Sequence, residues 1–470
     1  MRTPARRNDY RYAMAASEST ALLTDKYELT MVDAALHSGV ANRRSVFELF
    51  GRRMAPSRRY GVVAGTGRVL EALARFHFDD DQIAWLESQA FLSDKALDFL
   101  STFTFTGSIH GYAEGEVYFP GSPLLTVEGT FAEATLLETL LLSALNYDCA
   151  VASAASRMTI AAHGRPCLDM GARRTHERAA VSAARASVIG GFVATSDLEA
   201  GRRYGIDTVG TSAHSFTLVQ DSEKAAFAAQ VATLGPDTTL LVDTYDIHQG
   251  VINGVEAARA AGGELGAVRI DSGDLVAHAF QVREQLDSLG AQSTKIVVTS
   301  DLDEYAIASL GAAPVDSYGV GTRLVTGSGV PTAALVYKLV EREDSDGMMQ
   351  PVAKLSESKG TVGGEKVAGR LYTPDGRAVQ EALVMGSSRE ENRDRLLEVG
   401  GRLLQVPLVD NGRILEEAWS PEATWAAQDR HRKSRNELPY QAWRLSDGEP
   451  GIRTRYYGPE TPVENFSWVE

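Results

Sequence analysis

The sequence predicts an α/β protein centred on a barrel of parallel strands. Between residues 166 and 323, short apolar runs alternate with stretches of helical spacing, and each apolar run stops at a group of polar residues. Strands and helices that alternate in this way indicate right-handed crossovers and a parallel sheet. Seven such units are more than a small doubly wound domain needs, and none opens with the GxGxxG turn of a dinucleotide-binding fold. A barrel is therefore favoured over an open nucleotide-binding sheet.

The seven units follow one another along the chain. Each candidate strand, together with the polar residues after it, covers one of the ranges 168–174, 194–197, 206–216, 240–246, 268–274, 296–301 and 318–323. Helices fill the gaps, as where Phe227, Val231 and Leu234 recur at helical spacing before Gly235 and Pro236 end the segment. In a barrel the carboxyl ends of all strands face one mouth. The polar groups of the seven ranges should therefore meet in one pocket.

This pocket would combine arginine, carboxylate, hydroxyl and imidazole groups. Arg173 offers bidentate recognition of a carboxylate or phosphate, and the amides and hydroxyl of residues 321–322 suit a phosphate. Asp243 and Asp271 can ligate Mg²⁺ through water or orient an imidazole. His214, so oriented, can act as a base or a nucleophile. These residues predict an enzyme that acts on an anionic, phosphorylated substrate with Mg²⁺, and they leave an aldolase, an isomerase and a transferase open.

The segments outside the predicted barrel show other patterns. Thr24 or Asp25 can cap a helix with Glu28 in the reciprocal position, and Tyr27 would project from its first turn. The spacing further predicts a strand over 45–50, a helix over 69–76, antiparallel strands over 107–127, helices over 131–163 and a helix from 420–421 to 439.

Composition excludes several classes of protein. The net charge of -15, from 47 basic and 62 acidic residues, has the wrong sign for a nucleic-acid-binding protein. No apolar run approaches the ~20 residues that span a bilayer, so no membrane segment is expected. Cys149 and Cys167 are too few for a disulfide framework or a four-cysteine zinc site, which fits a reducing cytoplasm. Residues 1–18 contain arginines but no apolar core, so we expect a flexible tail and no secretory signal.

Five segments carry a resemblance to a known family. Residues 23–27, 171–174, 210–216, 269–275 and 318–323 closely resemble, in order and spacing, the motifs of nicotinate phosphoribosyltransferases. The resemblance covers about residues 22 to 359 and implies a type II phosphoribosyltransferase fold. This is an irregular (β/α) barrel beside a second α/β domain assembled from N- and C-terminal segments. We expect an N-terminal domain over 19–145, a catalytic barrel over 146–345 and a C-terminal segment over 346–470 that packs on the N-terminal domain.

The resemblance also implies a reaction. Members of the family join nicotinate to phosphoribosyl pyrophosphate, giving nicotinate mononucleotide and pyrophosphate, which is the first step of NAD salvage from nicotinate. ATP is consumed through a phosphohistidine at the position of His214. The resemblance implies Mg²⁺ held mainly by the substrates, and two cysteines argue against the structural zinc of some relatives. It further implies a homodimer in which the neighbouring subunit lends the Tyr27 region to the site.

Residue roles follow from the same resemblance. Nicotinate would be held by Tyr27, Arg173, Thr211 and Arg269, with Ser215 as a further substrate-binding candidate. Phosphate groups would be held by Gly321, Thr322, Lys354 and Lys359. Asp271 and Asp243 would lie near the ribose and Mg²⁺.

Ser212 bears on the choice of base. In nicotinamide-using relatives an acidic residue follows the Gly-Thr pair, and such a carboxylate would repel the carboxylate of nicotinate. Serine at this position favours nicotinate, to which its hydroxyl could donate. The alternatives are a nicotinamide- or quinolinate-using relative and a non-catalytic ligand-binding barrel. A Schiff-base lyase is disfavoured, because Lys295 begins its strand instead of ending it.

Overall fold

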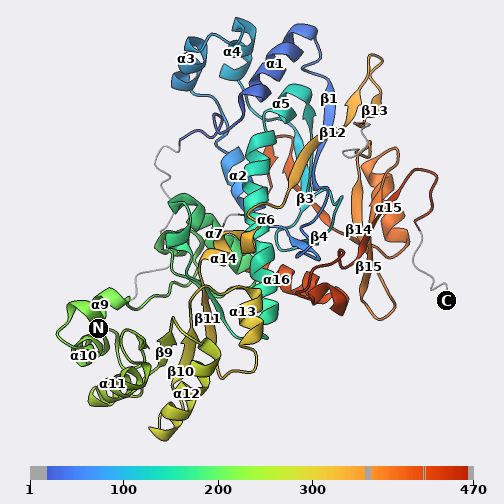
Figure 1. Cartoon of the computed structure of the whole chain (residues 1–470). Helices are drawn as coiled ribbons and strands as arrows, with labels where there is room; N and C mark the ends of the chain where they lie inside the picture. Colours follow the sequence, from blue (N-terminus) through green and yellow to red (C-terminus); the bar gives the residue numbers. More distant parts are fainter. Residues whose placement is uncertain (1–17, 355–360, 416–417, 419, 464–470) are drawn as a thin grey trace.

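A curled sheet of parallel strands carries the polar strand ends. The structure, a computed structural model, describes residues 18–354, 361–415, 418 and 420–463. Its parallel sheet has the strand order β7-β6-β11-β10-β9-β8 and forms a half-barrel (Figure 1). The strands are β6 (Cys167–Asp169), β7 (Ala194–Thr195), β8 (Thr239–Leu241), β9 (Ala267–Ile270), β10 (Lys295–Val298) and β11 (Ser317–Val320). The predicted α/β class with an irregular barrel is confirmed. The unit that bears His214 contributes one parallel bridge, between Thr195 and Thr208, in place of a full strand.

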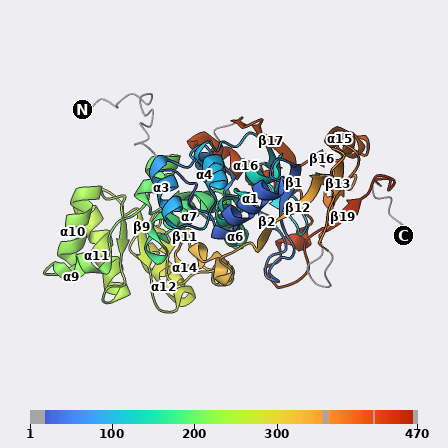
Figure 2. The same cartoon turned by 90° about the horizontal axis from the view of Figure 1, so that it is seen from above.

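Helices connect these strands, as the alternating pattern predicts. They are η1 (Ala172–Arg174), α7 (Glu177–Ile189), α8 (Leu198–Tyr204), α9 (His214–Val219), α10 (Glu223–Leu234), α11 (Ile247–Ala260), α12 (Leu275–Ser288), α13 (Glu304–Ser309), α14 (Thr322–Val325) and η2 (Gly327–Gly329). Figure 2 shows α9 to α12 at one end of the molecule, far from α15 (Arg389–Glu398) and β19 (Arg453–Tyr457).

The aspartates that follow the strands divide into two groups. Asp197, Asp246 and Asp274 each accept a hydrogen bond from a backbone N–H three residues later, at 2.7 to 3.1 Å. They are the N-caps of α8, α11 and α12, and a cap of this kind contributes about 1 kcal/mol. Among the described helices, neither Asp243 nor Asp271 is an N-cap. These two carboxylates therefore need another explanation.

A second, antiparallel sheet joins segments from both halves of the chain. Its order is β13-β12-β1-β5-β3-β17-β18, and the strands are β1 (Arg44–Gly51), β3 (Ser108–Tyr112), β5 (Leu125–Thr130), β12 (Leu335–Glu343), β13 (Met349–Pro351), β17 (Gln405–Asp410) and β18 (Arg413–Ile414). Glu48 of β1 lies opposite Lys338 of β12, and Tyr112 of β3 lies opposite Gln405 of β17. The second domain is thus assembled from N- and C-terminal segments, as predicted. The predicted domain ranges, 19–145, 146–345 and 346–470, stay predictions.

The remaining strands form two smaller sheets. These are β16 (Arg402–Leu403), β14 (Val367–Tyr372), β15 (Ala378–Val384) and β19 in one sheet, and β2 (Gly61–Val62) with β4 (Val117–Tyr118) in the other. Buried Arg370 connects the first of them to its surroundings, because its Nη2 lies 3.1 Å from Glu381 Oε2 and its Nη1 3.4 Å from Glu437 Oε2. Glu437 directly follows α16 (Pro421–Asn436), whose predicted start with a serine cap and a first-turn proline is present. The short helix η3 (Tyr440–Trp443) comes next.

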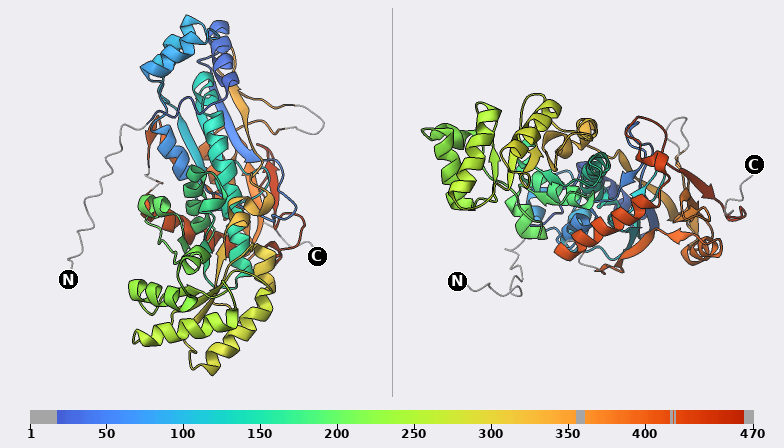
Figure 3. Two further views of the ribbon diagram at one scale, coloured as in Figure 1. Left: turned by 60° about the vertical axis from the view of Figure 1, so that its left-hand side comes forward. Right: turned by 90° about the horizontal axis from the view of Figure 1, so that it is seen from below.

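One long helix connects the two large sheets. The N-terminal helices are α1 (Lys26–Ser38), α2 (Thr66–Leu73), α3 (Asp80–Ser88), α4 (Asp94–Ser101), α5 (Phe131–Thr135) and α6 (Glu138–Ala161). Figure 3 shows α6 running lengthwise through the molecule. Leu141 and Leu145 belong to the core of the antiparallel sheet, whereas Val151 and Met158 belong to the core of the half-barrel. Each such fully buried side chain contributes about 1.5–3 kcal/mol, so α6 stabilises both cores at once. No helix in the described ranges, α6 included, is long and apolar enough to cross a membrane.

The start of α1 differs from the predicted capping arrangement. Asp25 is the N-cap, but its side chain makes no capping hydrogen bond. Glu28 is fully buried; it accepts a hydrogen bond from the backbone N–H of Thr139 at 2.9 Å and another from the Thr24 hydroxyl. Burial raises the pKa of Glu28 to about 7 although these hydrogen bonds oppose the shift. Glu28 therefore fixes α1 to the start of α6 instead of completing a reciprocal cap.

Candidate active site

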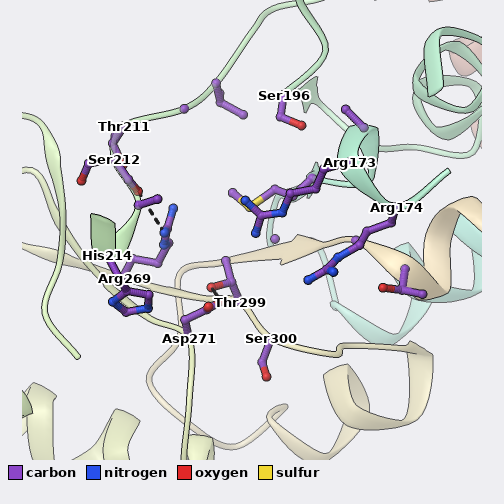
Figure 4. Close-up of a pocket in the computed structure, with 18 of the residues that line it drawn as sticks. Arg173, Arg174, Ser196, Thr211, Ser212, His214, Arg269, Asp271, Thr299 and Ser300 are labelled. Atoms are coloured by element: carbon purple, nitrogen blue, oxygen red, sulfur yellow. Dashed lines mark hydrogen bonds between the residues drawn. The ribbon is translucent and has the colours of Figure 1, made fainter. Parts of the chain in front are cut away.

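A pocket at the carboxyl ends of the parallel strands gathers most of the predicted site residues. It has a volume of about 590 Å³. The predicted residues that line it are Arg173, Thr211, His214, Arg269, Asp271, Gly321 and Thr322. They come from the ends of separate units of the half-barrel, and Figure 4 shows most of them pointing into one space. The alternation of strands and helices predicted that the strand ends converge. The structure shows this convergence for these residues.

The 210–213 segment forms one wall of the pocket. Val209 donates its backbone N–H to Thr195 O at 2.9 Å, which holds the segment beside the edge strand β7. The carbonyl oxygen of Ser212 accepts a hydrogen bond from Arg269 Nη2 at 3.1 Å (Figure 4). His214 then begins α9. The segment and the start of α9 thereby present Thr211 and His214 to the pocket.

The hydroxyl of Ser212 is held by a residue that the sequence did not single out. Ser212 Oγ donates to Gln230 Oε1 at 2.8 Å, and Gln230 is a buried residue of α10. A serine hydroxyl has one proton. The expectation that Ser212 donates to the carboxylate of nicotinate is therefore not met in this arrangement. Periodicity could not have found Gln230, because a glutamine in a helix carries no chemical signature.

The imidazole of His214 lies over a buried carboxylate. Its Nδ1 is 3.1 Å from the hydroxyl of Thr244, and its Nε2 is 3.9 Å from Asp243 Oδ1. Asp243 Oδ2 accepts from the backbone N–H of Asp271 at 2.9 Å and from the hydroxyl of Ser272 at 2.7 Å. Its Oδ1 is buried and has no hydrogen-bond partner among the described residues. Asp243 is not among the residues that line the pocket, and its carboxylate faces the ring of His214.

Two arginines give the pocket its positive charge on the side of His214. Arg173 belongs to η1, and Arg269 extends from β9. Burial lowers the pKa of Arg269, and Arg173 adds to this shift while Asp271 and Asp243 oppose it. An arginine stays protonated in spite of such shifts. The buried Nε of Arg269 has no hydrogen-bond partner within the described residues. The guanidinium is therefore ready to bind an anion.

A buried aspartate fixes the turn that carries Arg173. Asp169 Oδ1 accepts from the backbone N–H of Gly171 at 2.8 Å, and Oδ2 accepts from the Thr195 hydroxyl at 2.7 Å. Its backbone oxygen accepts from the N–H of Ser196 at 2.7 Å. Burial raises the pKa of Asp169 to about 6. Asp169 thus connects β6 to β7 and positions the turn without lining the pocket.

Further residues line the pocket that received no role from the sequence. These are Met170, Ala172, Arg174, Ser196, Val209, Gly210, Ala213, Thr299, Ser300, Asp301 and Gly319; Ser212, which the sequence analysis connected with the choice of base, lines the pocket as well. The Thr299 hydroxyl donates to Asp271 Oδ1, so Thr299 orients that carboxylate. Ser300 has a φ of 117°, a left-handed conformation that is rare for a residue with a side chain. Residues 299–301 had been grouped as a polar strand end, which was the available signal.

Other predicted residues lie elsewhere. Tyr27 is on α1, and Figures 1 and 3 place α1 and α9 at opposite ends of the molecule. Tyr27 is 44% exposed, so its ring is available to another chain. Ser215 and Lys354 are exposed and do not line the pocket. Lys359 lies outside the described residues. In the part of the chain that is described, no group of three or more His, Cys, Asp or Glu side chains could hold a metal ion.

Comparisons with known proteins show which sequences and structures this chain resembles. Residues 22–146 match the family model of the nicotinate phosphoribosyltransferase N-terminal domain. The chain is 53% identical over 442 residues to nicotinate phosphoribosyltransferase pncB1 of Mycobacterium tuberculosis, covering 92% of this chain and 94% of the relative. It is 38% identical to pncB2 of the same organism, covering 91% and 89%.

Solved structures show the same fold. The structure of human nicotinic acid phosphoribosyltransferase matches with a TM-score of 0.77 at 23% identity, covering 93% of this chain and 98% of the human chain. A nicotinate-nucleotide pyrophosphorylase from Pyrococcus furiosus matches with a TM-score of 0.71 at 22% identity, covering 91% and 98%. At these identities the likeness concerns the fold.

Proposed function

The chain belongs to the nicotinate phosphoribosyltransferase family, and from this premise we propose that it joins nicotinate to phosphoribosyl pyrophosphate. The products would be nicotinate mononucleotide and pyrophosphate, in the first step of NAD salvage from nicotinate. One observation carries the proposal for this chain's own residues. A single pocket brings the cations Arg173 and Arg269 together with the Gly321–Thr322 turn, around the imidazole of His214. Such a pocket suits two anionic substrates.

The chemistry requires positioning more than proton transfer. The ring nitrogen of nicotinate attacks the anomeric carbon, the bond to pyrophosphate breaks, and the ribose passes through an oxocarbenium-like state. An enzyme accelerates such a step by holding the reactants in line and by placing charges where charge develops. Arg173 and Arg269, with Thr211, would hold the nicotinate carboxylate. Asp271, whose carboxylate is oriented by Thr299, would face the ribose.

The phosphate end of the sugar substrate would lie at the opposite side of the pocket. Gly321 and Thr322 offer a backbone amide and a hydroxyl at the end of β11. Lys354, together with Lys359, remains a proposed phosphate partner; as an exposed side chain, Lys354 would have to reach its phosphate from outside the pocket. Ser215 remains a proposed substrate-binding residue on the first turn of α9.

His214 is the proposed site of ATP coupling. An imidazole nitrogen would attack the γ-phosphorus of ATP, the bond to ADP would break, and water would later cleave the N–P bond. A neutral ring with a fixed orientation favours this role. The contact of Nδ1 with Thr244 at 3.1 Å and the nearby charge of Asp243 support it. Asp243 would stabilise positive charge on the ring as the N–P bond forms.

Mg²⁺ is the proposed metal, carried mainly by the phosphates of the substrates. Asp271 and Asp301 line the pocket with carboxylate oxygens, the donor type that Mg²⁺ prefers. Two carboxylates without further protein ligands fit an ion that keeps most of its ligands from substrate and water. When bound, Mg²⁺ neutralises charge on the leaving pyrophosphate. No structural zinc is proposed.

The proposed assembly is a homodimer in which Tyr27 reaches the neighbouring pocket. Exposed apolar side chains occur in both regions that would meet: Leu23 and Met31 around Tyr27, and Leu218 and Val219 on α9 next to the pocket. A dimer axis would bring α1 of one subunit to α9 of the other. The buried, unpaired thiols of Cys149 and Cys167 support a cytoplasmic location.

Turnover with different bases tests the proposal. The full chain is incubated with phosphoribosyl pyrophosphate, Mg²⁺, ATP and either nicotinate, nicotinamide or quinolinate, and nucleotide product and ADP are measured. We expect product and ADP with nicotinate, and loss of nicotinate-dependent ADP release in His214→Ala. Product from nicotinamide or quinolinate alone would establish one of the alternative enzymes. No product and no ADP with any base would favour a non-catalytic ligand-binding barrel.

A further inference from the structure

Arg174 is a second arginine in the pocket, next to Arg173 but with no assigned role. Both residues belong to the one-turn helix η1, and both line the pocket. Figure 4 shows their side chains entering the cavity along separate paths from neighbouring positions. The two guanidinium groups therefore serve different parts of the same cavity.

Separate contacts define the two paths. Arg173 is close enough to Arg269 to shift its pKa, which places Arg173 on the side of the 210–213 segment. The side chain of Arg174 instead runs beside Gly321, because a Cβ built at Gly321 would lie 3.8 Å from Arg174 Cγ. Arg174 thus lies on the side of the Gly321–Thr322 turn, away from the proposed site of the base.

The charge of Arg174 is uncompensated. Within the described residues, Arg174 makes no ion pair and no side-chain hydrogen bond with the protein. The carboxylate of Asp271, which also lines the pocket, accepts the Thr299 hydroxyl and forms no ion pair with Arg174. A free guanidinium in a concave site is typical of a position that binds phosphate or carboxylate through two parallel N–H groups.

We propose that Arg174 binds a phosphate group of phosphoribosyl pyrophosphate, while Arg173 and Arg269 bind the carboxylate of the base. This inference rests on the proposed function and assigns the sugar substrate to a named cation. Either the 5′-phosphate or the pyrophosphate could supply the group, since both present the same oxygens. The position beside Gly321 predicts that Arg174 acts on the sugar substrate alone.

The test separates the two substrates. Arg174→Gln removes the charge at similar length, Arg174→Lys keeps a point charge, and Arg178→Gln changes an exposed arginine of α7 outside the pocket. We expect Arg174→Gln to raise KM for phosphoribosyl pyrophosphate by about 10- to 100-fold, the loss typical of a charge-assisted hydrogen bond. KM for nicotinate should stay within about threefold, Arg174→Lys should recover part of the loss, and Arg178→Gln should match the wild type.

Direct binding identifies the phosphate and does not depend on turnover. Calorimetric titration with ribose 5-phosphate and, separately, with inorganic pyrophosphate and Mg²⁺ measures affinity for each end of the substrate. A weakened affinity for either probe in Arg174→Gln, with unchanged thermal unfolding, supports the inference. Unchanged affinity for both probes, or an effect on nicotinate alone, would overturn it. A wild type that binds ribose 5-phosphate through Arg174 but turns over no base would leave this inference standing while the proposed function fails.

Discussion

Ser212 Oγ donates its only proton to Gln230 Oε1, at 2.8 Å, and Gln230 does not line the pocket. The side-chain amide of Gln230 is held in one orientation, because its Nε2 donates to Thr239 O at 2.9 Å and to the Thr238 hydroxyl at 3.3 Å. Its oxygen is therefore kept facing Ser212. The hydroxyl that the sequence offered as a donor to nicotinate instead anchors the wall of the pocket to α10.

This relationship predicts that Ser212→Ala and Gln230→Leu have similar effects on nicotinate binding. Both remove the bond between the two side chains, which is worth about 0.5–1.5 kcal/mol, and both should raise KM for nicotinate by less than about fivefold through a small shift of the wall. In a double-mutant cycle, the double variant should raise KM no more than the single variants do, whereas the unfolding free energy should fall further in Gln230→Leu, which also removes the two hydrogen bonds of Nε2. If Ser212 donated to nicotinate directly, Ser212→Ala would weaken nicotinate binding strongly while Gln230→Leu would not.

Charge at position 212 should control the choice of base. Ser212→Asp places a carboxylate in a pocket-lining residue whose backbone oxygen accepts a hydrogen bond from Arg269, the proposed partner of the nicotinate carboxylate. Like charges in a desolvated site cost several kcal/mol, so we expect KM for nicotinate to rise by more than about tenfold and nicotinamide to become a better substrate. Ser212→Asn has nearly the same shape without the charge and is the matched control. Equal effects of the two substitutions would show that size, and not charge, disfavours nicotinate.

Asp243 should affect ATP coupling more than substrate binding. Its carboxylate is 3.9 Å from His214 Nε2, and its side chain is 1% exposed. We expect Asp243→Asn to lower the formation of acid-labile phosphohistidine by about 10- to 100-fold, because the amide no longer stabilises positive charge on a correctly placed ring. The quantity to measure is phosphate transferred from labelled ATP. Asp246→Asn, in the same loop, is the control, since asparagine also caps helices. An equal loss in both variants would indicate a general disturbance of the loop.

The pKa of Asp169 predicts a specific dependence of stability on pH. Its folded-state pKa is about 6, whereas the ordinary value is 3.8. Between these values the folded protein binds more protons than the unfolded chain, so this group stabilises the fold as pH falls from about 6 to about 4. Asp169→Asn does not titrate. The unfolding free energy of the wild type relative to this variant should rise by about 1–3 kcal/mol between pH 7 and pH 4, measured with urea. A difference that is flat over this range would contradict the raised pKa.

The sequence predicts the pocket better than it predicts the residues that support it. Arg173, His214 and Thr322 could be placed together because the carboxyl ends of parallel strands share one edge of a sheet, whatever their side chains. Gln230 and Thr244 could not be placed there, because their roles depend on how α10 packs against Ser212 and how the loop after β8 packs against His214. The supporting role of Asp169 could not be predicted for another reason. A single buried carboxylate at the end of a strand leaves no periodic pattern in the sequence.

Long-range pairing sets the same limit on the fold. The sequence alone indicates that residues 45–50 form a strand, but not that β1 pairs with β12 almost three hundred residues later. Only the family resemblance supplied a domain made from both chain ends. The helix boundaries shifted for local reasons, as in the 131–163 segment, where Leu136 and Leu137 separate α5 from α6.

Tyr27 provides the decisive test of the proposed dimer. It lies on α1, at the other end of the molecule from His214, so within one subunit the two residues cannot act on the same substrate (Figure 1). If Tyr27 acts on the neighbouring pocket, Tyr27→Ala and His214→Ala should each lower activity, and mixing the two variants should restore part of it. In a mixed dimer, one pocket would then contain its own His214 and the intact Tyr27 of its partner.

The size of the recovery follows from random assembly. After subunits have been exchanged, about half of the dimers are mixed and one pocket in each is complete, so about a quarter of wild-type activity is expected. Nicotinate-dependent release of pyrophosphate is the measurement. In the control mixture of His214→Ala with Asp243→Asn, activity must not exceed the average of the two variants measured alone, because both residues belong to the same subunit's pocket and no pocket in a mixed dimer regains both. A Tyr27→Ala mixture that stays inactive although mixed dimers are present would show that Tyr27 does not serve the neighbouring pocket, and it would leave the exposed ring on α1 with a structural role only.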